Sequence, residues 1–260
     1  MHTLTHALGI QLGEMVAFVG AGGKTTTLQR LLIELRAAGR TVLTTSTVHM
    51  FPLKGVPAHP FVIEPDPAAL AAQLPGLLAE AGHVRVAGEQ LRVDKIRGLD
   101  AAQVAALKTL PGLDNLLVEA DGARHRSLKA PAVHEPALPA GVDLLLIIVG
   151  LDIIGKPLDE DHVHRPEQVA AITGLPIGAT ITPAAVAAVV TSPAGGLKDV
   201  PPGVRCWVVA TKFSYDTAPV GGELASAVLT AGDSRIEGVV LLGAGPVEQI
   251  GSAPMVVVKW

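Results

Sequence analysis

The stretch Met15-Val16-Ala17-Phe18-Val19-Gly20-Ala21-Gly22-Gly23-Lys24-Thr25-Thr26 decides the fold of this 260-residue chain. Its apolar beginning predicts a buried strand that ends at Gly20. The residues from Lys24 to Arg36 carry leucines at helical spacing, which predicts an amphipathic helix that stops near Gly39. A second apolar strand follows at Thr41 to Thr45, so the stretch opens a βαβ unit with a glycine-rich first turn.

The composition favours an α/β protein built on an aliphatic core. Hydrophobic residues make up 49% of the chain and aromatic residues only 3%, which suits a mostly parallel sheet covered by helices on both faces. We therefore expect a P-loop NTPase-like, doubly wound α/β fold. We expect one domain over residues 1–260, with long loops after strands at about 121–140 and 151–165. The expected helices are 67–81, 100–110, 166–173, 183–190 and 222–231, and the clearest later strands are 116–118, 142–149, 204–210 and 239–242, with 255–258 at an edge.

Charge and cysteine content narrow the class of protein. The formal net charge is −4, so no basic field is available to bind nucleic acid. The single cysteine cannot form an internal disulfide, which fits a reducing compartment. The longest apolar run, Leu144 to Val149, is too short to cross a bilayer, and the N-terminus lacks the pattern of a signal peptide. We expect a soluble, cytoplasmic protein without membrane or nucleic-acid partners.

The glycine-rich turn has the composition of a phosphate-binding loop. Glycines let backbone N–H groups approach a phosphoryl group, a lysine supplies positive charge, and a hydroxyl helps to hold Mg²⁺. The predicted nucleotide-binding residues are Gly20, Ala21, Gly22, Gly23, Lys24, Thr25 and Thr26. The first glycine of the full pattern is replaced by Phe18, so the loop is a shortened variant, close to the Gly-x-x-Gly-Lys-Thr loops of ATP-dependent amide ligases. The alternative is an ordinary glycine-rich turn between a strand and a helix.

Two carboxylates close a later apolar strand, at Glu119 and Asp121. Strand alternation predicts that both point to one face, where they can bind Mg²⁺ and one can act as a base. We assign Asp121 to the metal and Glu119 to the metal or a base; the alternative is a simple Asp-Gly turn. Arg124 follows on a loop, with Arg126 and Lys129, and is a candidate clamp for transferred phosphate, against an alternative of solvated loop charges.

Other polar residues carry weaker predictions. Thr44, Thr45 and Thr47 either contact Mg²⁺ or phosphate or serve only as good strand residues. His162 and His164 share a face if extended, but a structural or surface role is favoured over a metal site. Cys206 lies in an apolar strand and is expected to be buried. Thr211-Lys212 resembles the start of a guanine-reading motif, but Ser214 stands where its aspartate belongs, which favours ATP over GTP.

Several segments together resemble one family, the selenium-dependent hydroxylase accessory proteins usually called YqeC. The similar segments are 19–27, 44–50, 118–123, 128–131, 134–136 and 164–167. The resemblance runs in order over most of the chain. It implies a P-loop α/β fold and a role in maturing selenium-dependent molybdenum hydroxylases, with such a hydroxylase or its cofactor-maturation proteins as partners.

The combined hypothesis is a protein that binds ATP and Mg²⁺ and acts as an NTPase or phosphoryl-activating enzyme in hydroxylase maturation. Lys24, Glu119, Asp121 and Arg124 are its predicted catalytic residues, and Thr25, Glu119 and Asp121 its metal ligands. One alternative is a nucleotide-switched chaperone that delivers a cofactor with little turnover. The other is an ATP-dependent ligase that activates a carboxylate, as the shortened loop suggests.

Overall fold

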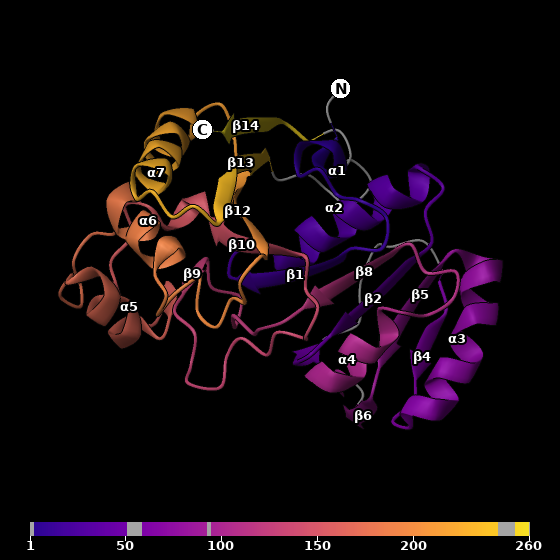
Figure 1. Cartoon of the computed structure of the whole chain (residues 1–260). Helices are drawn as coiled ribbons and strands as arrows, with labels where there is room; N and C mark the ends of the chain where they lie inside the picture. The colour runs from indigo at the N-terminus through magenta and orange to yellow at the C-terminus, as the bar shows by residue number, and fades with distance from the viewer. Residues whose placement is uncertain (1–2, 51–58, 93–94, 244–252, 260) are drawn as a thin grey trace. The chain divides into compact units, whose positions relative to one another are not determined.

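The computed structural model describes residues 3–50, 59–92, 95–243 and 253–259 and shows an α/β protein (Figure 1). Its main sheet has nine strands, in the order β14-β13-β12-β10-β1-β8-β2-β5-β4. These strands are β1 (Met15–Gly20), β2 (Val42–Ser46), β4 (Phe61–Ile63), β5 (His83–Ala87), β8 (Asn115–Glu119), β10 (Leu144–Gly150), β12 (Arg205–Phe213), β13 (Ile236–Gly243) and β14 (Met255–Lys259). Among the described residues, β14 pairs antiparallel with β13 at the edge where it was expected, whereas β1 with β8, β8 with β2, β2 with β5, β5 with β4 and β12 with β13 pair in parallel. The predicted α/β class with a mostly parallel sheet is confirmed.

Contacts between residues divide the chain into two compact units. Unit 1 comprises residues 1–18, 25–120 and 137–144, and unit 2 comprises residues 19–24, 121–136 and 145–260. The strands β1 and β10 each run from one unit into the other. No helix in the described ranges is both long and apolar enough to span a membrane.

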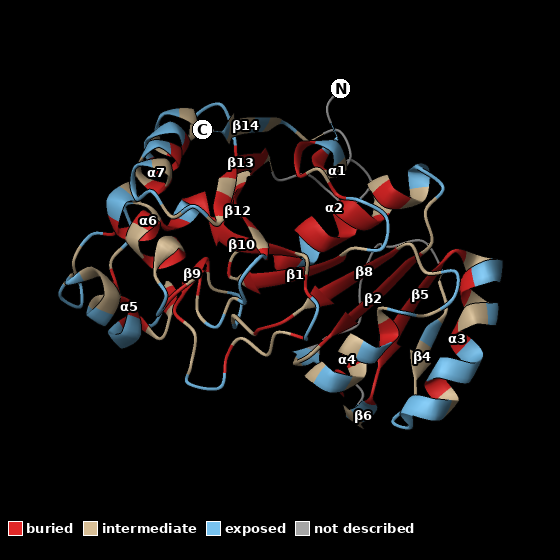
Figure 2. Cartoon of the chain, viewed as in Figure 1, coloured by how far each residue is buried: buried red, intermediate tan, exposed pale blue. Residues whose placement is uncertain are grey.

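Unit 1 is built on the parallel strands β1, β8, β2, β5 and β4. Its helices are α1 (Leu4–Ala7), α2 (Lys24–Ala37), α3 (Pro67–Ala81) and α4 (Ala101–Leu107), and β3 (His49–Met50), β6 (Glu89–Arg92) and β7 (Lys95–Arg97) form a small separate sheet. In Figure 1, α2 lies above the strands and α4 below them. Figure 2 shows that these central strands are buried while the outer face of α3 is exposed. Helix α3 has the predicted bounds because Asp66 caps its start and Gly82, in the left-handed conformation, ends it.

Unit 2 contains β10, β12, β13 and β14 with the helices α5 (Pro166–Thr173), α6 (Pro183–Thr191) and α7 (Ala218–Thr230). These three helices lie together along one side of the strands (Figure 1). All seven residues of β10 are buried, as its apolar sequence predicted. Two short strands, β9 (Leu128–Lys129) and β11 (Val163–His164), pair in parallel, so they join the two long loops that follow strands.

Candidate functional site

The glycine-rich loop is shorter than a full phosphate-binding loop. Strand β1 continues through Phe18 to Gly20 and α2 begins at Lys24, so only three residues connect them. Phe18 is completely buried in the strand at the position where the longer pattern has glycine. The φ angles of Gly20, Gly22 and Gly23 are +93°, +86° and +149°, a range that favours glycine. A short glycine-rich turn of three residues therefore connects the buried strand to the helix.

The loop is also packed closely against the rest of unit 2. A Cβ on Gly20 would lie 2.2 Å from the Ile148 carbonyl oxygen, and one on Gly22 would lie 2.6 Å from the Gly150 nitrogen. The Ala21 N–H donates to the Ile148 carbonyl at 2.8 Å. Close packing accordingly requires glycine at two of these positions before any ligand is considered.

A hydroxyl from β12 fastens the same loop. Thr211 Oγ1 donates to the Gly22 carbonyl at 2.5 Å and lies 3.2 Å from the Val149 carbonyl. A Cβ on Gly23 would come within 2.9 Å of the Thr211 methyl carbon. Lys212 follows with a φ of +61°, and its Nζ contacts Ser127 Oγ at 2.7 Å and Asp152 Oδ2 at 2.6 Å. The segment that resembles a base-reading motif thus holds the glycine loop in this structure.

Lys24 is folded over its own loop and is only 5% exposed. Its Nζ donates to the Gly20 carbonyl at 2.6 Å and lies 3.0 Å from Asp121 Oδ1. The other oxygen of Asp121 accepts from the Gly20 N–H at 2.9 Å and lies 2.9 Å from Lys129 Nζ. Asp121 therefore contacts two ammonium groups and the loop backbone.

These contacts continue into a buried network of side chains with alternating charges. Lys129 Nζ lies 2.7 Å from Glu135 Oε2 and 2.6 Å from the Gly122 carbonyl. Arg165 reaches both oxygens of Glu135, at 2.7 and 3.2 Å. This charged network consists of three cations and two carboxylates, in the order Lys24–Asp121–Lys129–Glu135–Arg165. It connects the glycine loop to the start of α5 and carries a net charge of +1.

Hydrogen bonding fixes the charge of Glu135. Burial alone would raise the pKa of its carboxyl, but hydrogen bonds from Arg165 and Lys129, the Lys129 charge and the Ala132 N–H outweigh it and lower the pKa to about 2. Lys198 Nζ also contacts the Glu135 backbone carbonyl and lies 2.9 Å from the Val133 carbonyl. Glu135 is therefore ionised and contacts Lys129 and Arg165 through its carboxylate and Lys198 through its backbone carbonyl.

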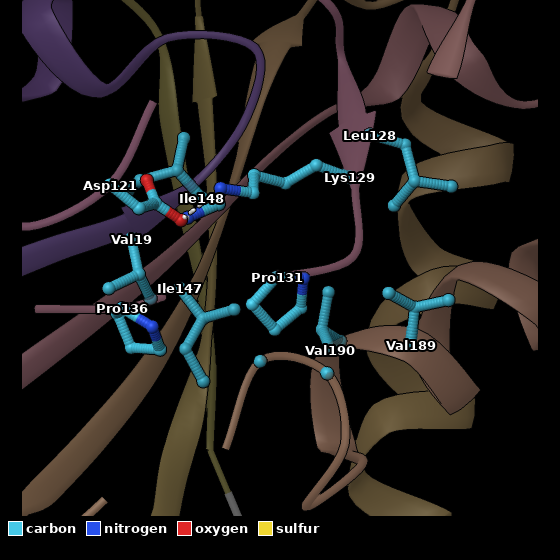
Figure 3. A pocket seen from close by; sticks show the side chains of 13 residues that line it. Val19, Asp121, Leu128, Lys129, Pro131, Pro136, Ile147, Ile148, Val189 and Val190 are labelled. Atoms are coloured by element: carbon cyan, nitrogen blue, oxygen red, sulfur yellow. Dashed lines mark hydrogen bonds and ion pairs between the residues drawn. The ribbon is translucent and has the colours of Figure 1, made fainter. Parts of the chain in front are cut away.

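An apolar pocket lies beside this charged network within unit 2. Figure 3 shows Lys129 extended towards Asp121 at one end of the pocket, with aliphatic side chains around the rest. The apolar lining includes Val19, Ile147, Ile148, Val189 and Val190. Asp121 and Lys129 supply its charged atoms.

Glu119 and Asp121 fall in different units, and strand alternation cannot relate them. Strand β8 ends at Glu119, so Asp121 already lies beyond the regular strand. Alternation applies within a strand, so it does not determine the face of Asp121, and the shared role of the two carboxylates stays a prediction. In unit 1, Glu119 Oε2 accepts from Thr25 Oγ1 at 3.4 Å, and Thr25 follows Lys24 directly in the first turn of α2.

Glu119 and Thr25 line a polar pocket of unit 1 together with Thr44, Thr45, Ser46 and Arg85. The hydroxyl of Thr45 donates to the Val86 carbonyl at 3.0 Å, and that of Ser46 to the Glu119 carbonyl at 2.9 Å. Thr44 Oγ1 lies 3.0 Å from His83 Nε2, and Thr47 Oγ1 donates to the Ala137 carbonyl at 2.8 Å. The sequence reasoning missed Arg85 and His83, because a short His-Val-Arg-Val-Ala strand with alternating polar residues is also typical of a solvent-facing edge.

The remaining candidates lie in several places. Arg124 is exposed and adopts a positive φ of 47°, and Thr26 is exposed beside Thr25. His162 Nδ1 contacts Asp159 Oδ1 at 2.7 Å, whereas burial and nearby Arg165, Lys129 and Arg124 lower the pKa of His164 to about 4. Over the described ranges, no three His, Cys, Asp or Glu side chains come together in a way that could hold a metal ion. Cys206 is buried, as expected, and burial raises the pKa of its thiol to about 12.

Fold and site together define an α/β protein with a mostly parallel sheet and a short glycine loop whose lysine is held by a buried carboxylate. The family model described as YqeC protein matches residues 16–167, which include the loop, both strand-end carboxylates and Arg165. The chain is 37% identical over 216 residues to a protein of Escherichia coli (strain K12) described as "Uncharacterized protein YqeC". The alignment covers 80% of this chain and 81% of that protein. The chain belongs to the YqeC family.

Proposed function

We propose that this chain binds ATP with Mg²⁺ at the glycine loop and uses it in maturing selenium-dependent molybdenum hydroxylases. The observation that carries the nucleotide is the three-residue glycine connection from a buried parallel strand into a 14-residue helix that begins at Lys24. An α-helix leaves its first four N–H groups without intrahelical partners, and its dipole favours an anion there. These N–H groups and Lys24 would hold the phosphates.

The oxygen atoms of Thr25 and Glu119 fit a magnesium ion. They lie 3.4 Å apart, and a hydroxyl and a carboxylate are the hard donors that Mg²⁺ prefers. Bound there, the ion would neutralise phosphate charge. Asp121 suits this role less well, because ammonium groups lie 3.0 and 2.9 Å from its two oxygens. We therefore assign the metal to Thr25 and Glu119, and assign Asp121 to positioning Lys24.

The proposal that a molybdenum hydroxylase is the client, meaning the protein that this chain helps to mature, rests on the family resemblance. The exposed Arg124 supports only a general contact with an anion. ATP is favoured over GTP because Ser214 occupies the place of a guanine-reading aspartate; here the Ser214 N–H donates to Thr217 Oγ1 at 2.8 Å.

Calorimetric titration of ATP with and without Mg²⁺ tests the nucleotide site. Lys24→Ala removes the loop cation, and Lys156→Ala removes an exposed lysine of the same unit as a control. We expect binding to the native chain and to Lys156→Ala, and none to folded Lys24→Ala. Unchanged affinity in folded Lys24→Ala would refute the assignment, and a clear preference for GTP in competition would refute the choice of base.

Phosphate release then separates the kinds of function. An NTPase or ligase should release phosphate with a small-molecule co-substrate alone. A nucleotide-switched chaperone should release it only when a molybdenum hydroxylase client is present, or barely at all. The measurement compares purified protein with ATP and Mg²⁺ alone, with a small-molecule co-substrate added, and with a molybdenum hydroxylase added.

A further inference from the structure

The connection from β12 to α7 in unit 2 carries an aromatic side chain that the proposed function does not use. Tyr215 is 86% exposed, and among the described residues its hydroxyl has no hydrogen-bond partner and its ring contacts no other ring or cation. The other described aromatic residues are Phe18, Phe61, Trp207 and Phe213, and none is more than 38% exposed. A single exposed apolar side chain is ordinary on a protein surface, so any further conclusion depends on where Tyr215 lies.

Strand β12 brings Tyr215 close to the glycine loop within the same unit. Thr211 Oγ1 donates to the Gly22 carbonyl, and a Cβ on Gly23 would lie 2.9 Å from the Thr211 methyl carbon. Tyr215 follows Thr211 by four residues, which span at most about 14 Å even in a fully extended chain. A nucleoside triphosphate is of comparable length. A nucleotide with its phosphates on the loop is therefore long enough to reach Tyr215 with its base.

The end of β12 departs from regular strand geometry just before this residue. The pairing of β12 with β13 shifts register between Thr211 and Phe213, and Lys212 has a φ of +61°. Bulges change the direction of side chains and are frequent next to active sites. Left-handed conformations of residues other than glycine also cluster at functional sites. Hydrogen bonds from Lys212 Nζ to Ser127 and Asp152 hold this irregular backbone in place.

Further hydrogen bonds fix the turn that presents Tyr215. The Ser214 N–H donates to Thr217 Oγ1 at 2.8 Å, and the Thr217 N–H donates to the Ser214 carbonyl at 3.1 Å. The Ala218 N–H, at the start of α7, donates to the Tyr215 carbonyl at 3.3 Å. The backbone of Tyr215 is therefore fixed before a ligand arrives. Because tyrosine has only two side-chain torsions, little conformational entropy remains to be lost on binding.

We propose that the exposed ring of Tyr215 is the platform on which the base of the bound nucleotide stacks. This inference rests on the proposed function, which places the phosphates on the glycine loop. Every nucleobase has a π-face, so an aromatic platform accepts adenine and does not by itself reject guanine. What Tyr215 selects is an aromatic base over a bare phosphate chain.

Titrations of the full chain with ATP, inorganic tripolyphosphate and adenosine, in the presence of Mg²⁺, test this platform. Tyr215 is the only tyrosine of the sequence, so selective labelling of tyrosine gives one set of ring signals in NMR. We expect ATP and adenosine to move these signals saturably and tripolyphosphate to leave them in place. Tyr215→Ala should bind ATP at least about fivefold more weakly than the native chain, and should bind tripolyphosphate equally well.

Two matched variants separate stacking from other effects. Tyr215→Phe keeps the ring and should retain the ATP affinity within about twofold. Ile177→Ala removes another apolar side chain of the same unit, one that is 55% exposed, and should leave the ATP affinity unchanged. Because Tyr215 is exposed, Tyr215→Ala is expected to fold.

Full ATP affinity in Tyr215→Ala, or ring signals that stay in place at saturating ATP, would overturn the platform and leave the nucleotide site intact. An equal loss of tripolyphosphate affinity in Tyr215→Ala would also overturn it, because that ligand has no base. If neither ATP nor tripolyphosphate binds, the proposed nucleotide site fails and adenosine decides the platform. Saturable movement of the ring signals by adenosine would then support a base site at Tyr215, and unmoved signals would overturn it.

Discussion

Replacing Glu135 with glutamine is the most direct test of how much the buried charged network of unit 2 contributes to stability. The glutamine keeps the size of the side chain but removes the negative charge between Lys129 and Arg165. Lys129 retains Asp121 at 2.9 Å and the Gly122 carbonyl at 2.6 Å. Arg165 retains the Ala130 carbonyl at 3.2 Å. The substitution therefore removes only the ionic contacts of the Glu135 carboxylate with Lys129 and Arg165.

The magnitude follows from the pKa of Glu135, which the folded protein lowers from 4.5 to about 2. A lowered carboxyl pKa stabilises the folded state above the unfolded pKa, and this stabilisation disappears as the pH falls through the folded pKa. This lowering of the pKa corresponds to a stabilisation of about 3 kcal/mol at pH 7 and of about 2 kcal/mol at pH 3.5. Glu135→Gln should lose this contribution.

Urea unfolding at several pH values, followed by the fluorescence of the buried Trp207 in the same unit, measures the effect. We expect Glu135→Gln to be about 3 kcal/mol less stable than the native chain at pH 7, with a gap that narrows below pH 4.5. Glu160→Gln, at an exposed position of unit 2, should change stability by less than about 0.5 kcal/mol. A gap below about 1 kcal/mol at pH 7, or one that stays constant down to pH 3.5, would refute this role of Glu135.

Three further predictions follow from single residues. The ring signals of His83 should not titrate between pH 8 and pH 4.5 in NMR, because burial lowers its pKa to about 3; since the unfolded histidine takes up a proton below about 6.5, this residue reduces stability as the pH falls from there. Cys206 should not react with Ellman's reagent in the native chain and should react fully in denaturant, since burial raises the pKa of its thiol to about 12. Gly22→Ala should destabilise the chain by at least about 2 kcal/mol more than Gly39→Ala in urea unfolding, because both have positive φ but only a Cβ on Gly22 would meet backbone, 2.6 Å from Gly150 N; equal losses would contradict the close packing of the loop.

Local signals predicted the elements whose ends carry their own capping residues. Helix α5 has the predicted bounds, with a proline in its first turn and a left-handed Gly174 at its end. Helix α4 starts as predicted, because Asp100 and Gln103 form a capping box, but it ends at Leu107 instead of Leu110. Strong caps and stops are encoded within a few residues, so they can be recognised without tertiary information.

Tertiary packing decided the elements that were predicted less well. Helix α7 begins at Ala218, four residues before the predicted start at Gly222, and includes Pro219 and Gly221. A Cβ on Gly221 would lie 3.0 Å from a Leu241 methyl group, so the small residue permits close packing of the helix on β13. Propensity alone gives the opposite answer at such a position.

The candidate site divides in the same way. The glycine loop and its lysine were visible in sequence because their spacing is local. The partners of Asp121 were not, since Lys24 is 97 residues away along the chain and Lys129 is in the two-residue strand β9, which is too short to give a recognisable sequence pattern. Arg85 could not be distinguished from an exposed strand residue until the neighbours of β5 were known, because alternation fixes the face of a residue but not what covers that face.

The pairing of Lys24 with Asp121 also bears on how the proposed nucleotide site would respond to metal. In the structure, the loop lysine lies 3.0 Å from the buried carboxylate of Asp121, which also contacts Lys129. A phosphate chain that arrives without Mg²⁺ meets the helix N–H groups and a lysine that is paired with Asp121. It must therefore compete with Asp121 for that lysine. A phosphate chain that arrives with Mg²⁺ brings its own neutralising charge, which Thr25 and Glu119 are suited to receive. The proposed site should therefore depend on Mg²⁺ more strongly than a loop with an unengaged lysine would. Asp121→Asn should reduce this dependence while it weakens the folded chain through Lys129, and an equal Mg²⁺ dependence in folded Asp121→Asn would show that the ion pair does not regulate the loop.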